Sequence, residues 1–199
     1  MTEEEPEPTI RRRPGGRAAR VRQAVLAAAM EALAEGGPAR LSIADVAARA
    51  GVNETTVYRR WGSREKLALD AMLTASDEGM PVPDTGAVRT DLAAFARALA
   101  DYLATPLGGA VARAAAFGAE DPELAESWQT FWRTRLDQVG AVVRRAVERG
   151  ELPPGTDVDL AVELLCAPLQ TRALLGHGRI EPDLPERLAD LVLDGLRGR

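Results

Sequence analysis

Apolar residues recur at helical spacing along almost the whole chain, and glycine and proline residues interrupt the pattern. In residues 17–35, Val25, Ala29 and Leu33 recur at the four-residue step of an amphipathic helix. The same spacing predicts helices over residues 42–50, 54–61, 63–77, 87–104, 110–118, 122–149, 157–175 and 184–196. No segment alternates with the two-residue period of a strand. We therefore expect an all-α fold of about nine helices.

Two features of this pattern concern helix ends and helix faces. Pro106, with Gly108 and Gly109, should end the helix over residues 87–104, and Pro168 should kink the helix that contains it. The apolar faces of the later helices include Trp132, which we expect to point inward, and also Leu160, Leu164 and Leu191. For the last two helices, the sequence leaves open whether these faces pack within one chain or against a second copy.

The segment from Leu41 to Leu67 has the strongest local signals. Ser42 is a good N-cap with Asp45 three residues later, and Gly51 can adopt the left-handed conformation that ends a helix. Asn53 then caps the next short helix. Two short helices joined by such a turn predict a helix-turn-helix, which places its second helix in the major groove of DNA.

The second helix of this motif combines one buried position with a polar outer face. Val57 points back toward the first helix, and the outward residues are hydroxyls, a phenol and guanidiniums that suit phosphate oxygens and base edges: Thr55, Thr56, Tyr58, Arg59 and Arg60. A helical hairpin used for protein contacts is the alternative interpretation.

Charge is distributed unevenly along the chain, whose net charge is −5. Residues 10–66 carry +7, residues 1–9 carry −4 and residues 67–199 carry −8. A basic segment beside an acidic body is typical of a nucleic-acid-binding protein. Arg11, Arg12, Arg13 and Arg17 precede or open the first helix; they form either an arm that contacts DNA or a solvated tail.

The helix-turn-helix segment resembles the DNA-binding domain of the TetR family of transcriptional regulators over roughly the first third of the chain. The matching residues are Leu41, Ser42, Ile43, Val46, Ala47, Gly51, Val52, Thr56, Val57, Tyr58, Ser63 and Leu67. Trp61 stands where the family usually has Phe, and it is also a large aromatic residue. Arg64 stands where the family usually has Lys, and it is also positively charged. The remaining chain resembles the family only in its length and helical pattern.

This resemblance implies a homodimeric regulator of double-stranded DNA, most often a repressor, with a near-palindromic operator. Thr55, Thr56 and either Arg59 or Arg60 are then the candidates for base edges. Phosphate contacts are expected from Ser42, Tyr58, Arg64 and Lys66. The implied organisation is a tail (1–16), a helix-turn-helix domain (17–66) and a helical domain (67–199) for dimerisation and effector binding. Activation instead of repression, or action without a ligand, stays open.

The acidic body suggests binding rather than catalysis. Its last two helices are expected to form the dimer contact. Its aromatic residues suggest a pocket for a small hydrophobic effector, with these candidates: Phe95, Leu99, Tyr102, Phe117, Trp128, Phe131, Trp132 and Arg172.

Residues able to carry out catalysis are scarce. His177 is the only histidine and Cys166 the only cysteine in the sequence. No glycine-rich phosphate loop and no metal-ligand spacing occurs. We expect no catalytic residue, cofactor or metal ion; a body that is an enzyme fused to a DNA-binding head is the alternative. The acidic N-terminus does not resemble a signal peptide, and no apolar run would span a bilayer, so a cytoplasmic location without membrane contact is expected.

Overall fold

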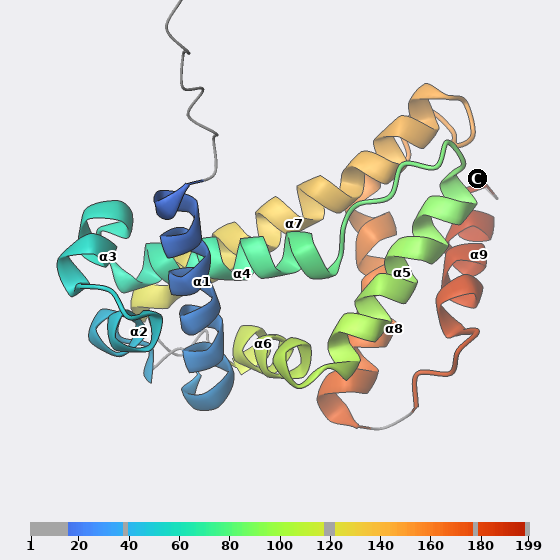
Figure 1. Ribbon diagram of the computed structural model, residues 1–199. Helices are drawn as coiled ribbons and strands as arrows, with labels where there is room; N and C mark the ends of the chain where they lie inside the picture. Colours follow the sequence, from blue (N-terminus) through green and yellow to red (C-terminus); the bar gives the residue numbers. More distant parts are fainter. Residues whose placement is uncertain (1–15, 38–39, 118–121, 177–178, 198–199) are drawn as a thin grey trace, which may run out of the picture.

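The computed structural model describes residues 16–37, 40–117, 122–176 and 179–197. These residues form nine α-helices and no strand, which confirms the expected all-α fold (Figure 1). The helices are α1 (Arg17–Gly36), α2 (Ile43–Ala50), α3 (Glu54–Trp61), α4 (Arg64–Gly79), α5 (Val88–Ala104), α6 (Pro106–Phe117), α7 (Pro122–Glu148), α8 (Val158–Leu175) and α9 (Leu184–Arg197).

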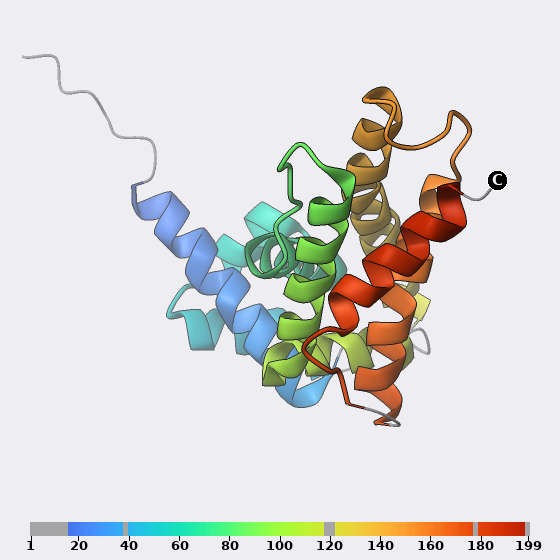
Figure 2. The ribbon, with the colours of Figure 1, turned by 90° about the vertical axis from the view of Figure 1, so that its right-hand side faces the viewer.

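The helices form two groups that α4 and α7 connect. Helices α1, α2 and α3 gather at one end of the molecule, and α4 runs from them toward α5, α8 and α9 (Figure 1). The turned view shows α9 beside α5 and in front of α8, in agreement with the contacts among these helices (Figure 2). Helix α7 is 27 residues long and packs against both α4 and α8, so it reaches from one group to the other.

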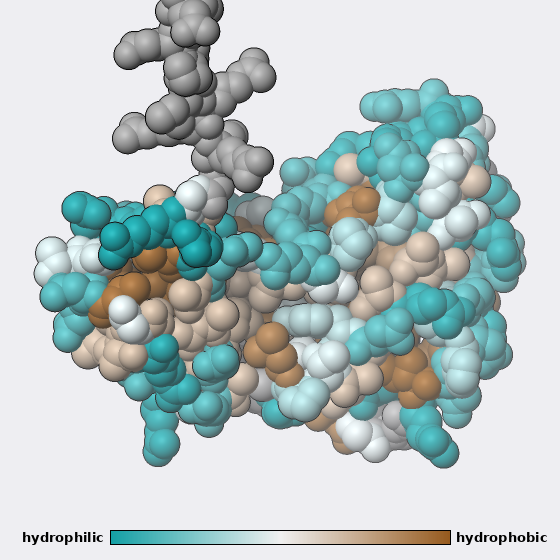
Figure 3. Space-filling model, in the orientation of Figure 1, coloured by the Kyte–Doolittle hydropathy of each residue, from teal (hydrophilic) through white to brown (hydrophobic). Residues whose placement is uncertain are grey.

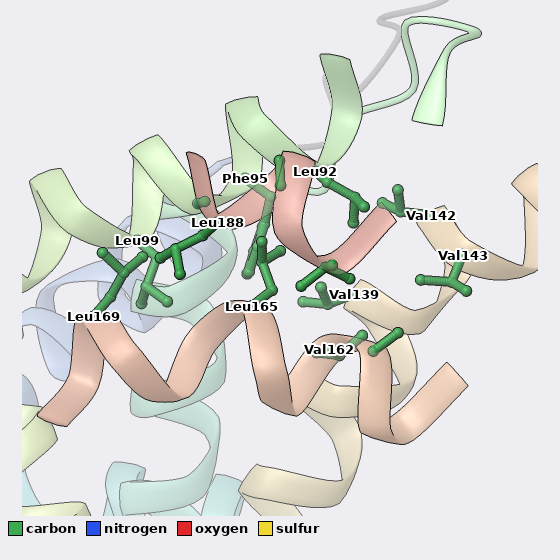
Figure 4. Close-up of a cluster of buried hydrophobic side chains, with 14 of the residues drawn as sticks. Leu92, Phe95, Leu99, Val139, Val142, Val143, Val162, Leu165, Leu169 and Leu188 are labelled. Carbon is green, nitrogen blue, oxygen red and sulfur yellow. The ribbon is translucent and has the colours of Figure 1, made fainter. Parts of the chain in front are cut away.

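Each group has its own buried apolar cluster. In the larger cluster, Leu92, Phe95 and Leu99 of α5 face the other body helices (Figure 4). Their partners are Val139, Val142 and Val143 of α7, Val162, Leu165 and Leu169 of α8, and Leu188 of α9. The smaller cluster contains side chains of the four helices α1, α2, α3 and α4. Val111 of α6 and Trp128 and Phe131 of α7 also belong to it. Because it extends along α4 as far as Met72, the core of the N-terminal group continues past residue 66.

Helix α6 begins four residues earlier than the sequence pattern predicts. Helix α5 ends at Ala104 as expected, but Pro106 is already the first residue of α6, because proline at this position loses no helical hydrogen bond. The Thr105 hydroxyl accepts a hydrogen bond from the Gly108 N–H at 2.9 Å and caps the new helix. Gly108 also lets the start of α6 lie close to the end of α5, since a Cβ at position 108 would lie 1.9 Å from the Tyr102 carbonyl oxygen.

Several large apolar side chains from the predicted apolar faces of α7, α8 and α9 are exposed in the single chain. They are Trp132 of α7, Leu160 and Leu164 of α8, and Leu191 of α9. Helix α8 buries Ala161, Leu165 and Leu169 against its own chain, so the face that carries Leu160 and Leu164 points away from the core. Hydrophilic side chains cover most of the body on the face shown in Figure 3. Within the described ranges, no helix is long and apolar enough to cross a membrane.

Candidate nucleic-acid interface and ligand cavity

The turn between α2 and α3 has the geometry that its residues predict. The Ser42 hydroxyl accepts a hydrogen bond from the Asp45 N–H at 3.2 Å. Gly51 adopts the left-handed conformation (φ 65°, ψ 33°), and its N–H bonds to the carbonyls at the end of α2. The Asn53 side chain accepts a hydrogen bond from the Thr55 N–H at 2.8 Å, which fixes the start of α3.

Helix α3 has a buried apolar inner face and a mostly exposed polar outer face. Val57 is fully buried against the helices behind it. Thr55, Arg59 and Arg60 are exposed, Thr56 is half-buried, and 53% of the Tyr58 surface is exposed. These side chains carry the hydroxyl, phenol and guanidinium donors that suit phosphate oxygens and base edges. The guanidinium of Arg60 lies 5.4 Å from the ring centroid of Trp61, within the range of a cation–π contact.

The other three candidate DNA-contact residues differ in their surroundings. Ser42 and Lys66 are exposed near the starts of α2 and α4. Arg64, the first residue of α4, is half-buried, and its Nε donates to Glu65 Oε1 at 2.9 Å. Arg11, Arg12 and Arg13 lie outside the described residues.

Asp70 of α4 connects α3 to α1. One carboxylate oxygen accepts a hydrogen bond from Trp61 Nε1 at 2.8 Å, and the other accepts one from Arg22 Nη2 at 2.7 Å. Arg22 Nη2 also donates to the Thr74 hydroxyl. The Trp61 ring is buried at the end of α3, so Asp70 fixes α3, α4 and α1 relative to one another. A phenylalanine at position 61 could not make this bond.

A cavity of about 400 Å³ lies among α4, α5, α6, α7 and α8. Five of the predicted pocket residues line it: Phe95, Leu99, Tyr102, Phe131 and Trp132. Two predicted residues lie elsewhere. Trp128 belongs to the buried cluster of the N-terminal group, because the start of α7 packs against α4. Arg172 donates to the Arg179 carbonyl at 2.6 Å, and its side chain does not line the cavity. The side chain of Phe117 lies outside the described part of the chain.

The sequence interpretation misses the two buried polar residues that line this cavity, Ser76 and Arg135. Arg135 is only 6% exposed, and it donates from Nη1 to Asp77 and Gln138 and from Nη2 to the Met80 carbonyl. A helical signal is present in the sequence, because Arg135 lies four residues after Phe131 and four before Val139 on one face of α7. The expected inward face of this helix contains apolar residues only.

Burial changes the acid–base properties of the cavity. It raises the pKa of the Tyr102 phenol, although the nearby Arg135 charge acts in the opposite direction. It also raises the pKa of the Cys166 thiol to about 12. Both groups are therefore neutral near pH 7. Across the residues that the structure places, no group of three His, Cys, Asp or Glu side chains has a metal-binding arrangement.

Comparison with known proteins identifies the family. A model of bacterial regulatory proteins of the tetR family matches residues 25–71, and a model of the tetracyclin repressor-like C-terminal domain matches residues 82–192. The chain belongs to the TetR family. It is therefore a helix-turn-helix transcriptional regulator, from a family of DNA-binding proteins that are not enzymes and that bind operators as dimers.

Two curated relatives cover most of the chain. The transcriptional regulator AqdR of Rhodococcus erythropolis is 36% identical over 179 residues, which are 90% of this chain and 86% of AqdR. The DNA-binding transcriptional repressor TetR of Mycobacteroides abscessus is 35% identical over 176 residues, which are 85% of this chain and 90% of that repressor.

Solved structures share the same fold. The crystal structure of the TetR family transcription regulator SCO0332 has a TM-score of 0.73 and 32% identity, and it covers 88% of this chain and 98% of its own. FadR of Bacillus subtilis, solved in complex with stearoyl-CoA, has a TM-score of 0.61 at 16% identity, with 88% of this chain and 97% of FadR covered. At that identity, FadR shows a shared fold only.

Proposed function

We propose that the protein is a homodimeric repressor that binds a near-palindromic operator and is released by a small, mostly apolar effector. The observation that carries this proposal is the exposed polar face of α3, held by capped ends and a buried Val57. In a dimer, the two α3 helices would enter successive major grooves about 34 Å apart. Residues 17–66 would bind DNA, and residues 67–199 would dimerise and hold the effector.

The exposed side chains divide into two proposed roles. Thr55, Thr56 and either Arg59 or Arg60 would contact base edges, since they lie on α3. Phosphate contacts would come from four residues near helix starts or at the edge of α3, Ser42, Tyr58, Arg64 and Lys66. The amides at the start of α4 would add to the attraction for a phosphate.

Selection from random duplex DNA, followed by anisotropy measurements at several salt concentrations, tests these roles. Lys66→Ala should weaken binding to the selected operator and to random DNA alike, and should lower the salt slope by about 1 for each phosphate that is no longer neutralised. Arg59→Ala should change the preferred sequence. Arg89→Ala is the control, because Arg89 lies on α5 and pairs with Asp190 of α9. Failure of the wild-type protein to select any sequence would favour the protein-interaction alternative.

The exposed leucines support a dimer contact through α8 and α9. Leu160 and Leu164 of α8 and Leu191 of α9 are 41%, 52% and 67% exposed, and burying them against a second copy would remove this apolar surface from water. Leu164→Glu should therefore give monomers in analytical ultracentrifugation and weaken operator binding. Glu163→Gln, at the neighbouring exposed position on α8, is the control. A dimer that tolerates Leu164→Glu at all protein concentrations would contradict this contact.

The cavity beside α4 supports release by an effector. Ser76 of α4 and Met80 just after it line the cavity, so a bound molecule would touch the helix that leads to the DNA-binding head. A coupling of about 1–3 kcal/mol between the two sites would change operator affinity from several-fold to a hundredfold. That FadR of the same fold was solved with stearoyl-CoA supports a ligand site in such a body.

A further inference from the structure

The polar groups of the cavity converge on the last turn of α4. Ser76 belongs to this turn, and Arg135 of α7 donates to the Asp77 carboxylate and to the Met80 carbonyl around it. The Tyr102 ring packs on the same turn, because a Cβ at Gly79 would lie 2.9 Å from Tyr102 Cδ2. Three polar side chains from three helices, Ser76, Tyr102 and Arg135, therefore line one region of a largely apolar cavity.

Two hydroxyls in this region are buried without a hydrogen-bond partner among the residues that the structure describes. They are Ser76 Oγ, in a side chain that is 1% exposed, and Tyr102 Oη. Buried hydroxyls in folded proteins are almost always hydrogen-bonded, to protein atoms, water or a ligand. Both groups can donate a proton, so an acceptor atom in the cavity would satisfy them.

Arg135 adds further donors. Its guanidinium has five N–H groups, and the described part of the chain accepts three hydrogen bonds from it, through Asp77, Gln138 and the Met80 carbonyl. Two N–H groups are left for another partner. The partner carboxylate of Asp77 is 53% exposed, so water weakens its hold on the buried Arg135 charge.

The remaining polar groups of the cavity are on α8, and they add no buried charge to that of Arg135. Glu163 is exposed and Gln170 is half-buried, so water and salt screen the Glu163 charge. Cys166 carries a neutral thiol. The buried charge of the cavity is therefore the Arg135 cation, which disfavours a positively charged head on a bound molecule.

We propose that the cavity binds a molecule with an apolar, ring-containing body and an oxygen acceptor at one end, which accepts hydrogen bonds from Ser76 Oγ, Tyr102 Oη and Arg135. This proposal rests on the proposed effector function and names the chemical class of the effector. The apolar body packs on the aromatic residues Phe95, Phe131 and Trp132. The volume of about 400 Å³ is at the lower end of the range for small-molecule sites and suits a fused two-ring molecule.

Four naphthalenes that differ only in the head group test the proposal in the absence of DNA. Isothermal titration calorimetry with the wild-type chain compares 2-naphthoate, 2-acetylnaphthalene, 2-(aminomethyl)naphthalene and 2-ethylnaphthalene. The two carbonyl compounds should bind about tenfold or more tightly than the hydrocarbon, and the cationic amine should bind most weakly. Equal binding of all four heads, preference for the amine, or no binding of either carbonyl compound overturns the proposal.

Two mild variants assign the effect to named atoms. Tyr102→Phe and Ser76→Ala should each reduce binding of 2-acetylnaphthalene by about threefold to tenfold while binding of 2-ethylnaphthalene stays the same. Thr90→Ala removes a hydroxyl from the exposed surface of α5 and should change neither. Unchanged carbonyl binding in both cavity variants would contradict the proposed contacts. Operator binding is measured separately: its absence in the wild-type chain removes the repressor function, whereas the calorimetric comparison still decides the ligand class.

Discussion

The contact between Asp70 and Trp61 predicts a stability effect that can be isolated from its surroundings. Replacing Asp70 by Ala removes the acceptor of the Trp61 indole N–H, and that indole is buried, with 7% of Trp61 exposed. The same change removes the ion pair with Arg22. Both members of this pair are about one third exposed, at 33% for Asp70 and 32% for Arg22.

The two losses differ in size. Leaving a buried donor unsatisfied costs about 1–3 kcal/mol, and an exposed ion pair is worth about 0.2–1 kcal/mol. We therefore expect Asp70→Ala to lower the free energy of unfolding by about 1–4 kcal/mol, most of it through Trp61. Asp190→Ala is the matched control, because Asp190 accepts two hydrogen bonds from Arg89 at 2.6 and 2.9 Å and contacts no tryptophan. Because this ion pair is exposed to solvent, that change should lower the free energy of unfolding much less than Asp70→Ala.

A double-mutant cycle separates the Trp61–Asp70 hydrogen bond from other effects. Trp61→Phe keeps a large aromatic ring and removes the N–H, and Phe is the usual residue at this position in the family that the sequence resembles. Urea unfolding followed by circular dichroism should be run at one protein concentration, because dimer formation contributes to stability. The cycle should give a coupling of about 1 kcal/mol or more between Trp61 and Asp70. Purely additive costs, or an Asp70→Ala cost no larger than that of Asp190→Ala, would refute the reasoning.

Three further predictions concern the body. Gly108→Ala should destabilise the protein by about 1–3 kcal/mol, because the new methyl meets the Tyr102 carbonyl oxygen; Gly109→Ala, whose nearest neighbour is the flexible Arg113 side chain at 3.3 Å, should be tolerated in thermal melts. Native Cys166 should react with a thiol reagent at pH 8 far more slowly than the unfolded chain, since its pKa is about 12. The Val88 N–H, and then Arg149, hold the pKa of Glu151 below its usual value, so the stability lost in Glu151→Ala at pH 7 should disappear as the pH falls below about 4.5.

The sequence predicts local structure correctly where the interactions that determine it lie within a few neighbouring residues. Ser42, Gly51 and Asn53 each act on backbone atoms within four residues, so their capping roles could be predicted and are confirmed. The apolar spacing likewise locates all nine helices in the described residues. Pro106 is ambiguous because proline both ends and begins helices, and only the position of Thr105 before Gly108 decides between the two.

Side chains whose surroundings depend on distant segments could not be placed in this way. Trp128 and Trp132 are one helical turn apart on α7, yet one is buried in the N-terminal core and the other is exposed beside the cavity. Leu164 is apolar at helical spacing, but α8 already packs its opposite face on the core. The buried position of Arg135 follows from contacts with Asp77 and Met80, which are more than fifty residues away in sequence.

Helix α4 carries both ends of the proposed signal. Its last turn, at Ser76, borders the cavity, and Asp70 lies six residues earlier, about 9 Å along the helix. Because Asp70 holds Trp61 and Arg22 at the same time, a shift of α4 would move α3 and α1 together. A ligand that displaces the last turn of α4 would then change the separation of the two α3 helices in a dimer. Each helix-turn-helix would stay intact. In this proposal, the Trp61–Asp70 hydrogen bond passes a displacement of α4 on to α3.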